Sequence, residues 1–350
     1  MEIRKATSKL DRREDLTRAE ARAVLEQLLS GTVSDAEIMA LLVALREKGE
    51  QVEELVGFAE VMRARAAETL HEAGVDLDGL RAVGPLLDTC GTGGDEKGTF
   101  NVSTTTALVA AAAGVRVAKH GNRSISSRCG SADVLEALGV KIDIPLERIP
   151  ECLEKVGMVF LFAPRLNLAM KHVMNARRAL KTKTVFNLLG PLTNPLAASV
   201  QVVGVYDRAR TEMMAKALAL LGARQAFVVA GHDGLDEITL TGPTQVSEAG
   251  SGKVTTREIA PEDFGLQRAG DESLKGGDAA INARLLRGVL AGERGPFLDV
   301  VLANTSAALV VAGRAASFPE GVALAREAID SSAALETLRK LVEFTQHAGP

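Results

Sequence analysis

Residues 88–139 decide the fold, and they read DTCGTGGDEKGTFNVSTTTALVAAAAGVRVAKHGNRSISSRCGSADVLEALG. This stretch contains two turns rich in glycine and hydroxyl side chains, residues 91–95 and residues 119–130. Each turn follows a short apolar run and leads into a segment with a helical pattern. Two consecutive strand–turn–helix units predict a parallel sheet whose loops share one edge, where such sheets bind ligands. The expected strands end at residues 87 and 118, and the expected helices span residues 103–113 and 131–138.

The residues of these two turns are suited to bind anions. Glycines without a Cβ let backbone N–H groups approach an anion closely, and helix N-termini add oriented donors and partial positive charge. Hydroxyl groups and cations are supplied by Ser103, Thr104, Ser124, Ser126, Ser127, Lys119, Arg123 and Arg128. One glycine-rich turn is a common structural feature, but two such turns together indicate a ligand with two phosphate groups. The chain has neither GxxxxGK[ST] nor a complete GxGxxG fingerprint, which argues against ATP or a dinucleotide.

The composition excludes several classes of function. Of the 350 residues, 46% are hydrophobic, and the net charge of −4 gives no reason to expect binding to nucleic acid or membranes. No apolar run is long enough to predict a membrane span, and the charged N-terminus does not resemble a secretory signal. Cys90, Cys129 and Cys152 lack CxxC spacing and are expected to be free thiols in the cytoplasm. The five histidines lack the spacing of a zinc site.

Residues 10–70 carry helical patterns without a strand signal. Thr17 with Glu20, and Ser34 with Glu37, form two capping boxes that each precede an apolar stripe. Strand patterns begin only at residue 86. The sequence therefore predicts an α/β fold with a mostly parallel central sheet flanked by helices, together with a smaller all-helical domain. Further strands are expected at residues 141–144, 159–162, 200–205 and 226–230.

Three later segments leave alternatives open. Residues 165–183 are basic and helical, and this pattern fits a solvated helix face, a nucleic-acid patch or an arginine that holds a substrate carboxylate. A nucleic-acid patch would need aromatic residues, which this segment lacks. Residues 186–195 are expected to form a short turn of helix broken by Pro191 and Pro195. Residues 236–237, Asp-Glu, follow an expected strand and fit either a Mg²⁺ site or a solvated acidic loop.

Several ordered motifs resemble the anthranilate phosphoribosyltransferase family, within the nucleoside-phosphorylase-like transferases. The resemblance covers nearly the whole chain and is specific, because the motifs are long and occur in order. The motifs are DTCGTGGD (88–95), NVST (101–104), KHGNRSISS (119–127), GSADVLEALG (130–139), NLLGPLTNP (187–195), GLDE (234–237) and GGDAAINA (276–283).

The resemblance implies a reaction and a domain organisation. The family transfers the phosphoribosyl group of phosphoribosyl pyrophosphate to anthranilate in tryptophan biosynthesis. Its members pair a helical domain, implied here for residues 1–82 plus 166–196, with an α/β domain, implied for residues 83–165 plus 197–350. The helical domain dimerises in the family, so a homodimer is expected, with phosphoribosyl pyrophosphate, anthranilate and Mg²⁺ as ligands.

The resemblance also implies site residues. The magnesium site, expected to hold two ions with the donor, corresponds to Ser103, Asp236 and Glu237. The residues that match the family's anthranilate-binding site are Gly91, Asn122 and Arg177, with His120 and Pro191 lining the channel. The residues that match the family's site for phosphoribosyl pyrophosphate are Gly91, Gly94, Asp95, Thr99, Asn101, Val102, Ser103, Thr104, Lys119, His120, Gly121, Asn122, Arg123, Ser124, Ile125, Ser126, Ser127 and Ser131.

One departure concerns the acceptor. Where the family usually has HPAMKH, this chain has Asn167-Leu168 in place of the histidine and proline. A related aromatic acid is therefore an alternative acceptor. Two other classes are disfavoured. A pyrimidine-nucleoside phosphorylase should carry a differently spaced Lys-Ser-Gly-Gly phosphate signature, which this sequence lacks. A non-catalytic nucleic-acid-binding relative should have degraded donor motifs and a basic net charge.

Overall fold

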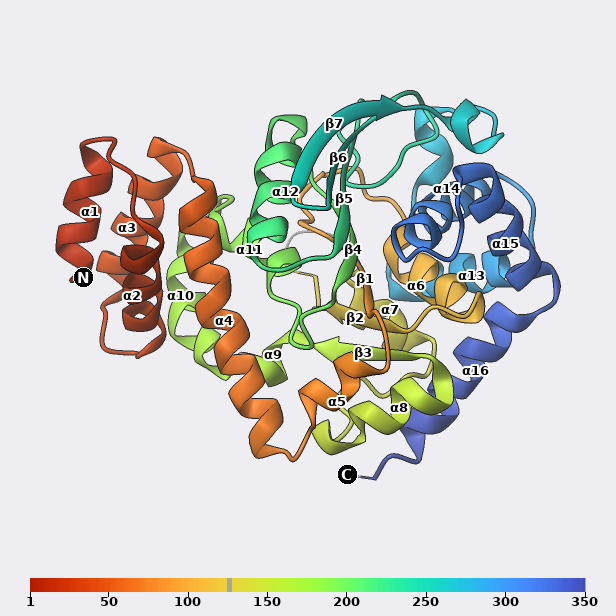
Figure 1. Ribbon diagram of the computed structural model, residues 1–350, viewed down its shortest axis with the longest axis horizontal. Helices are drawn as coiled ribbons and strands as arrows, with labels where there is room; N and C mark the ends of the chain where they lie inside the picture. The colour runs from red at the N-terminus through yellow and green to blue at the C-terminus, as the bar shows by residue number, and fades with distance from the viewer. Residues whose placement is uncertain (125–127, 350) are drawn as a thin grey trace.

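The computed structural model describes residues 1–124 and 128–349, and these residues form a seven-stranded sheet in the order β3-β2-β1-β4-β5-β6-β7 (Figure 1). The first five strands in this order are parallel, and β6 and β7 add an antiparallel hairpin to the edge. The predicted mostly parallel sheet is confirmed. The strands are β1 Leu87–Gly91, β2 Val117–Gly121, β3 Met158–Phe162, β4 Val200–Gly204, β5 Gln225–Gly231, β6 Thr244–Gly250 and β7 Lys253–Ile259.

The structure corrects three local expectations. β1 and β2 run beyond the strand ends predicted from the sequence, so Lys119 and His120 lie within a strand and not in a turn. Residues 141–144 form a turn and not the predicted strand, since they pair with no strand of the described sheet. Ile142 and Ile144 still bury their side chains in the core, which explains their apolar alternation. Pro191 does not break its helix, since it lies near the end of α11, Val185–Leu192.

An N-terminal bundle lies on one side of the sheet (Figure 1). Both predicted capping boxes are present: the Thr17 hydroxyl accepts from the Glu20 N–H at 3.2 Å, and the Ser34 hydroxyl from the Glu37 N–H at 3.4 Å. Within the described chain, no helix is both long and apolar enough to cross a membrane. The bundle helices are α1 Ile3–Asp11, α2 Arg18–Leu29, α3 Asp35–Lys48 and α4 Val52–Glu72; α5 Leu77–Ala82 follows them and buries Leu80 in the other core cluster.

A segment from the middle of the chain joins this bundle. Helix α10, Lys171–Leu180, packs against α2 and α3, and α11 packs against α3, α4, α12 (Thr211–Leu220) and β1. Val173, Ala176 and Leu188 are buried in the same apolar cluster as the bundle. The cluster continues onto one face of β4 and β5, so the bundle is anchored to the sheet. The short elements nearby are α9 Ala163–Leu166, η2 Leu168–Met170 and η3 Arg208–Arg210.

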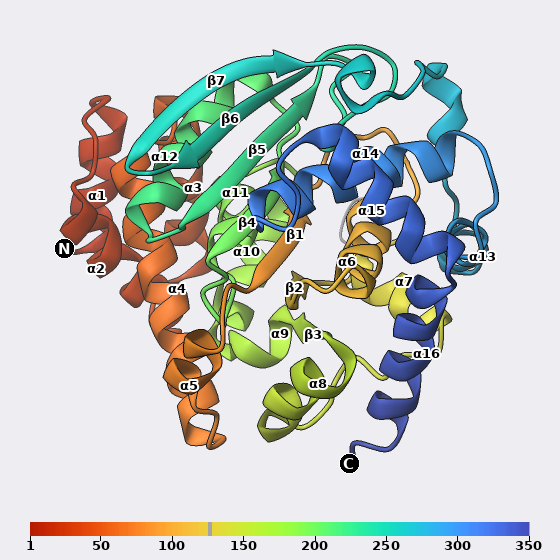
Figure 2. The ribbon, with the colours of Figure 1, turned by 45° about the vertical axis from the view of Figure 1, so that its right-hand side comes forward.

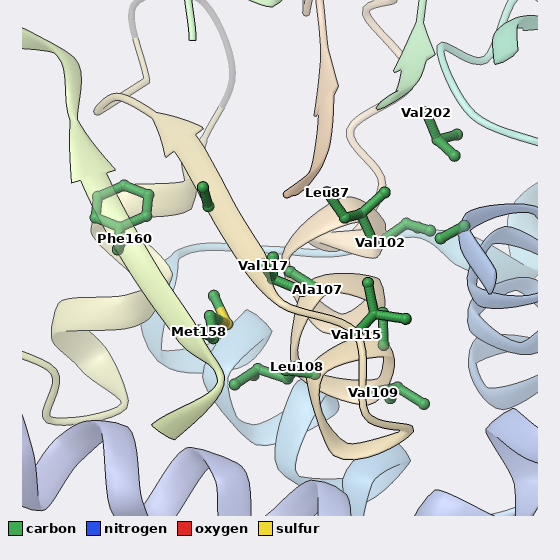
Figure 3. Packing of buried hydrophobic residues seen from close by; sticks show 14 of the residues in the cluster. Leu87, Val102, Ala107, Leu108, Val109, Val115, Val117, Met158, Phe160 and Val202 are labelled. Atoms are coloured by element: carbon green, nitrogen blue, oxygen red, sulfur yellow. The ribbon is translucent and has the colours of Figure 1, made fainter. Parts of the chain in front are cut away.

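Further helices cover the opposite face of the sheet (Figure 2). Helix α6, Val102–Ala112, is apolar on nearly every side and is therefore buried between the sheet and α14. Figure 3 shows Ala107, Leu108 and Val109 of α6 among the side chains of β1, β2 and β3. The other elements are α7 Ser131–Ala137, η1 Leu146–Arg148, α8 Ile149–Val156, η4 Pro261–Phe264, η5 Asp271–Leu274, α13 Ala279–Leu290, α14 Pro296–Val311, α15 Phe318–Asp330 and α16 Ala333–Gln346.

Candidate active site

The loop after β1 folds around one carboxylate. The Gly93 N–H donates to Asp236 Oδ2 at 2.9 Å, and the Thr92 N–H donates to the Gly204 carbonyl at 2.9 Å. A Cβ built on Gly91 would lie 2.5 Å from Asp236 Oδ2. Glycine is needed at residue 91 because the carboxylate occupies the space of a side chain. The sequence-predicted turn and the Asp-Glu pair are thus brought together at the carboxyl edge of the sheet.

Glu237 meets the start of helix α6. The Ser103 N–H donates to Glu237 Oε1 at 3.2 Å, and the helix N-terminus favours a negative charge there. Burial, followed by repulsion from Asp236, nevertheless raises the pKa of Glu237 well above its usual range. Burial, followed by repulsion from Asp95, raises the pKa of Asp236 to about 7. Asp236 and Glu237 therefore repel each other when ionised, and Asp95 adds to the repulsion at Asp236.

This carboxyl cluster fits a divalent cation. Asp95 Oδ2 is buried and has no hydrogen-bond partner among the described residues, and oxygen ligands of this kind suit Mg²⁺. Within residues 1–124 and 128–349, no group of three or more His, Cys, Asp or Glu side chains has the geometry of a complete metal site. Mg²⁺ prefers a few carboxylates plus water and substrate phosphates, and Asp95, Asp236 and Glu237 supply carboxyl groups of this kind. The predicted ligands Ser103, Asp236 and Glu237 lie around the same loop.

Lys119 occupies an unexpected position. Its side chain is only 1% exposed, and its ammonium donates to the Thr89 carbonyl and to Ser103 Oγ, the latter at 3.4 Å. Thr89 Oγ1 donates to the Ser103 carbonyl at 2.9 Å, which fixes the first turn of α6 to β1. Burial lowers the pKa of Lys119, whereas nearby Asp88, Cys90 and Glu237 act to raise it. In this structure Lys119 therefore supports the loop from beneath it.

The second turn is held by its own helix. Arg123 forms ion pairs with Asp133 and Glu136, and the Ser124 N–H donates to Asp133 Oδ2 at 3.0 Å. Ser131 Oγ donates to the Asn122 carbonyl at 3.3 Å. Other residues predicted for the donor site lie nearby. Gly121 is the last residue of β2, and Val102 and Thr104 are buried in α6. Thr99 forms an isolated antiparallel β-bridge with Lys275. Ile125, Ser126 and Ser127 lie outside the described residues.

The sequence pattern predicts that the helix beginning near residue 278 packs in the core. In the structure this helix, α13, also contacts residues of the candidate site. Asn282 Nδ2 donates to Asn101 Oδ1 at 2.9 Å, and Asn101 Nδ2 donates to the Cys129 carbonyl at 3.3 Å. The Gly277 N–H closes this chain by donating to Asn282 Oδ1 at 2.7 Å. Through Asn101, Asn282 thus connects α13 to the start of α6 and to the end of the second glycine-rich turn.

A second buried network lies under β2. Asp88 Oδ1 accepts from the His120 N–H at 3.1 Å, and Asp88 Oδ2 accepts from Asn194 Nδ2 at 2.8 Å. His120 Nε2 is buried without a hydrogen-bond partner in the part of the chain that the structure describes, and burial lowers the pKa of this histidine. Asn194 belongs to the NLLGPLTNP motif, so this network joins the end of α11 to the central sheet.

The two arginines of α10 differ in their surroundings. Arg178 is exposed, whereas Arg177 is half-buried over the ring of Phe186, with its guanidinium carbon 5.0 Å from the ring centroid. Burial lowers the pKa of Arg177, and no carboxylate pairs with it among the residues with described positions. At the sequence departure, Asn167 is buried and Leu168 is 67% exposed. Pro191 is buried, and its carbonyl accepts from Gln201 Nε2 at 2.9 Å.

Two protein-family models match this chain, one over the helical bundle and one over the α/β part. Residues 83–335 match the model described as glycosyl transferase family, a/b domain, and residues 4–66 match the one described as glycosyl transferase family, helical bundle domain. The chain belongs to this glycosyl transferase family.

Individual relatives define the branch of the family. The anthranilate phosphoribosyltransferase of Syntrophobacter fumaroxidans is 49% identical over 344 residues, which cover 98% of this chain and 99% of that one. The corresponding protein of Solibacter usitatus is 52% identical over 94% of each chain. Within the family, the chain belongs to the anthranilate phosphoribosyltransferases.

Solved structures have the same fold. The crystal structure of anthranilate phosphoribosyltransferase from Thermus thermophilus superposes with a TM-score of 0.86 at 44% identity, covering 97% of this chain and 99% of that one. The Saccharomyces cerevisiae enzyme, in complex with phosphoribosyl pyrophosphate and Mg, superposes with a TM-score of 0.85 at 28% identity, covering 98% of each chain. Another structure of the yeast enzyme contains 4-fluoroanthranilate.

Proposed function

We infer that this chain transfers the 5-phosphoribosyl group of phosphoribosyl pyrophosphate to the amine of anthranilate, releasing pyrophosphate. This reaction is the second step of tryptophan biosynthesis from chorismate. The observation that carries the inference is that Asp236 contacts the glycine-rich loop after β1 while Glu237 contacts the first turn of α6. A carboxylate pair that touches a phosphate-binding loop suits a donor that arrives with a divalent cation.

The donor site would be formed by both glycine-rich turns. Backbone N–H groups and hydroxyls of the two loops would bind the pyrophosphate and the ribose phosphate. Asp236, Glu237 and Ser103 would hold two Mg²⁺ ions together with the donor, and Asp95 stands beside them. When bound, Mg²⁺ would neutralise the charge that develops on the departing pyrophosphate. The protein itself would orient the sugar, because Asn101 is held by Asn282 and bonds the end of the second glycine-rich turn.

The acceptor side would be formed by α10 and α11. Arg177 has no carboxylate partner within the described residues and presents a planar guanidinium, which matches the carboxylate of anthranilate in two parallel hydrogen bonds. Gly91 and Asn122 would contact the acceptor, with His120 and Pro191 lining its channel. The aromatic amine is neutral at physiological pH, so the residues need only position it against the sugar carbon.

Two features of the whole molecule are part of the proposal. A homodimer would form through the N-terminal helices, and the chain would act in the cytoplasm. Cys90, Cys129 and Cys152 form no disulfide within the described residues, and burial raises the pKa of each thiol. Unreactive thiols of this kind are compatible with a reducing compartment.

Fluorimetry of anthranilate tests the reaction. Addition of phosphoribosyl pyrophosphate with Mg²⁺ should remove the anthranilate signal and release one pyrophosphate per anthranilate, and a chelator should stop both. If calorimetry detects donor binding while anthranilate persists, the acceptor is wrong, and related aromatic acids should be tried because Asn167 and Leu168 differ from the family pattern. If neither binding nor turnover occurs, the proposed function is wrong.

A further inference from the structure

A lysine from the acceptor side of the molecule lies over the first glycine-rich loop. Lys183 belongs to the connection between α10 and α11, and a Cβ built on Gly94 would lie 3.0 Å from Lys183 Cε and 3.6 Å from its Nζ. Gly94 has a φ of +78°, a conformation that favours glycine. The missing side chain at residue 94 therefore serves two purposes, because it permits the turn and leaves room for the lysine.

An aromatic ring fixes the ammonium of this lysine. Lys183 Nζ lies 3.6 Å from the ring centroid of Tyr206, which follows the carboxyl end of β4. An ammonium over the face of an aromatic ring is attracted by the ring quadrupole, but the ring accepts no conventional hydrogen bond. Lys183 is half-buried, and no hydrogen bond or ion pair to its Nζ occurs within the described part of the chain. A positive charge is thus positioned at the loop without an anionic partner.

Two of the three neighbouring cations expected at this site have other partners. Lys119 is buried and donates to the Thr89 carbonyl and Ser103 Oγ, and Arg123 is paired with Asp133 and Glu136. A phosphate group that binds the loop would therefore find neither charge free in this arrangement. Within the described residues, Lys183 supplies a charge without an ion-pair partner beside Gly94 of the first glycine-rich loop.

We propose that Lys183 binds the diphosphate group of the donor and that Tyr206 positions its ammonium for this contact. The inference rests on the proposed function, since it names a further ligand of the same site. A diphosphate ester carries more negative charge than the loop N–H groups can neutralise, and an ammonium makes strong, charge-assisted hydrogen bonds to phosphate oxygens. Because Lys183 lies between α10 and α11, the contact would also link the bound donor to the acceptor side.

Calorimetry with inorganic diphosphate and Mg²⁺ tests this contact directly. Lys183→Met should weaken diphosphate binding by about tenfold or more, the effect of losing one charge-assisted contact. Lys183→Arg should retain most of the affinity. Lys253→Met, which removes an exposed charge on the edge strand β7, is the matched control and should leave the affinity unchanged. Equal losses in Lys183→Met and Lys253→Met, or no loss in a folded Lys183→Met protein, would overturn the proposal.

The role of Tyr206 requires a separate measurement. Tyr206→Leu should weaken diphosphate binding less than Lys183→Met, Tyr206→Phe should have little effect, and Tyr206→Leu should add nothing in a Lys183→Met background. Steady-state kinetics should show a raised KM for phosphoribosyl pyrophosphate with little change in the KM for anthranilate. Independent, additive effects of the two substitutions would show that the tyrosine does not act through the lysine.

The same experiments separate this inference from the proposed function. If the wild-type protein binds Mg²⁺-diphosphate but does not consume anthranilate, the proposed reaction fails while the calorimetric comparison of Lys183 variants remains decisive. If turnover occurs and Lys183→Met has wild-type affinity for diphosphate, the reaction stands and the lysine is a structural residue. Should Lys183→Met fail to fold, Lys183→Arg and Tyr206→Leu provide the comparison, and wild-type affinity in Tyr206→Leu would then reject the arrangement.

Discussion

Asn194 Nδ2 donates to Asp88 Oδ2 at 2.8 Å, and both side chains are fully buried. The bond joins the segment after α11 to the first residues of β1, while Asp88 Oδ1 accepts from the His120 N–H. Asp88→Ala would leave these buried donors without an acceptor, and we expect a loss of about 3 kcal/mol in the free energy of unfolding. Urea unfolding measures this loss, with Asp78→Ala as an exposed control. A midpoint equal to that of the control would contradict the role of the network.

Two glycines set the position of Asp236. A Cβ on Gly204 would overlap the Asp236 carbonyl oxygen, and one on Gly91 would crowd its carboxylate. Gly204→Ala must move backbone and should cost about 2 kcal/mol or more in unfolding free energy. Gly91→Ala should cost less stability but should weaken Mg²⁺-dependent activity, because only the carboxylate is displaced. Gly190→Ala is the matched control, since nothing lies within 4 Å of its added Cβ. Unchanged Mg²⁺ dependence in Gly91→Ala would show that the carboxylate position is unimportant.

The clustered carboxylates predict opposite effects on stability and activity. Glu237→Gln keeps the shape of the side chain and removes a buried charge repelled by Asp236. Without Mg²⁺ the variant should melt at a higher temperature than the wild-type protein, whereas its activity with Mg²⁺ should fall by about a hundredfold or more. Thermal unfolding and turnover are compared on the same preparation. A lower melting temperature in the metal-free variant would mean that the Glu237 charge stabilises the fold.

Arg177 should determine acceptor affinity. Arg177→Ala is expected to raise the KM for anthranilate by about thirtyfold or more, since a paired guanidinium–carboxylate contact contributes roughly 2–3 kcal/mol. Arg177→Lys should recover only part of this loss because an ammonium cannot form the planar double contact. Arg178→Ala, the exposed neighbour on α10, should change the KM little. A wild-type KM for anthranilate in Arg177→Ala would remove the carboxylate clamp from the site.

His120 should make stability depend on pH. Burial lowers its pKa in the folded protein below the unfolded value of about 6.5, so the unfolded state binds the proton more readily. The contribution of neutral His120 to the free energy of unfolding is therefore complete above the unfolded-state pKa and is lost as the pH falls through the lower pKa of the folded state. The raised pKa of Asp236 gives the opposite slope, so the wild-type protein must be compared with His120→Gln. The difference in unfolding free energy should shrink from about pH 8 to about pH 5, and a constant difference would show that His120 does not titrate between these states.

The order of elements could be predicted from the sequence, but strand ends could not. Periodicity and the capping boxes at Thr17 and Ser34 identified the helical bundle, because local hydrogen bonds determine those helix starts. The apolar pattern of β2 stops before Lys119, and a lysine inside a central strand is acceptable only because Thr89 and Ser103 satisfy its ammonium. These partners are distant in sequence. Residues 141–144 gave the converse error, since alternating Ile142 and Ile144 fit a strand but pack as a turn.

The candidate site divides in the same way. Glycine turns and the Asp236–Glu237 pair carry local signals, and their motifs identified them. Asn282 and Lys183 act across the fold, from α13 and from the segment before α11, and nothing in their neighbouring residues indicates a partner. The positions of such residues follow from tertiary packing, which a single sequence does not reveal.

The contact of Lys183 with Tyr206 has a practical consequence. The chain has one tyrosine and no tryptophan, so its near-ultraviolet emission comes chiefly from a single ring. That ring lies beneath an ammonium, beside the loop that faces the donor. Any ligand that draws the ammonium away should alter this emission without a dye or an engineered label. The unmodified protein therefore contains an optical probe where the segment before α11 meets the first glycine-rich loop.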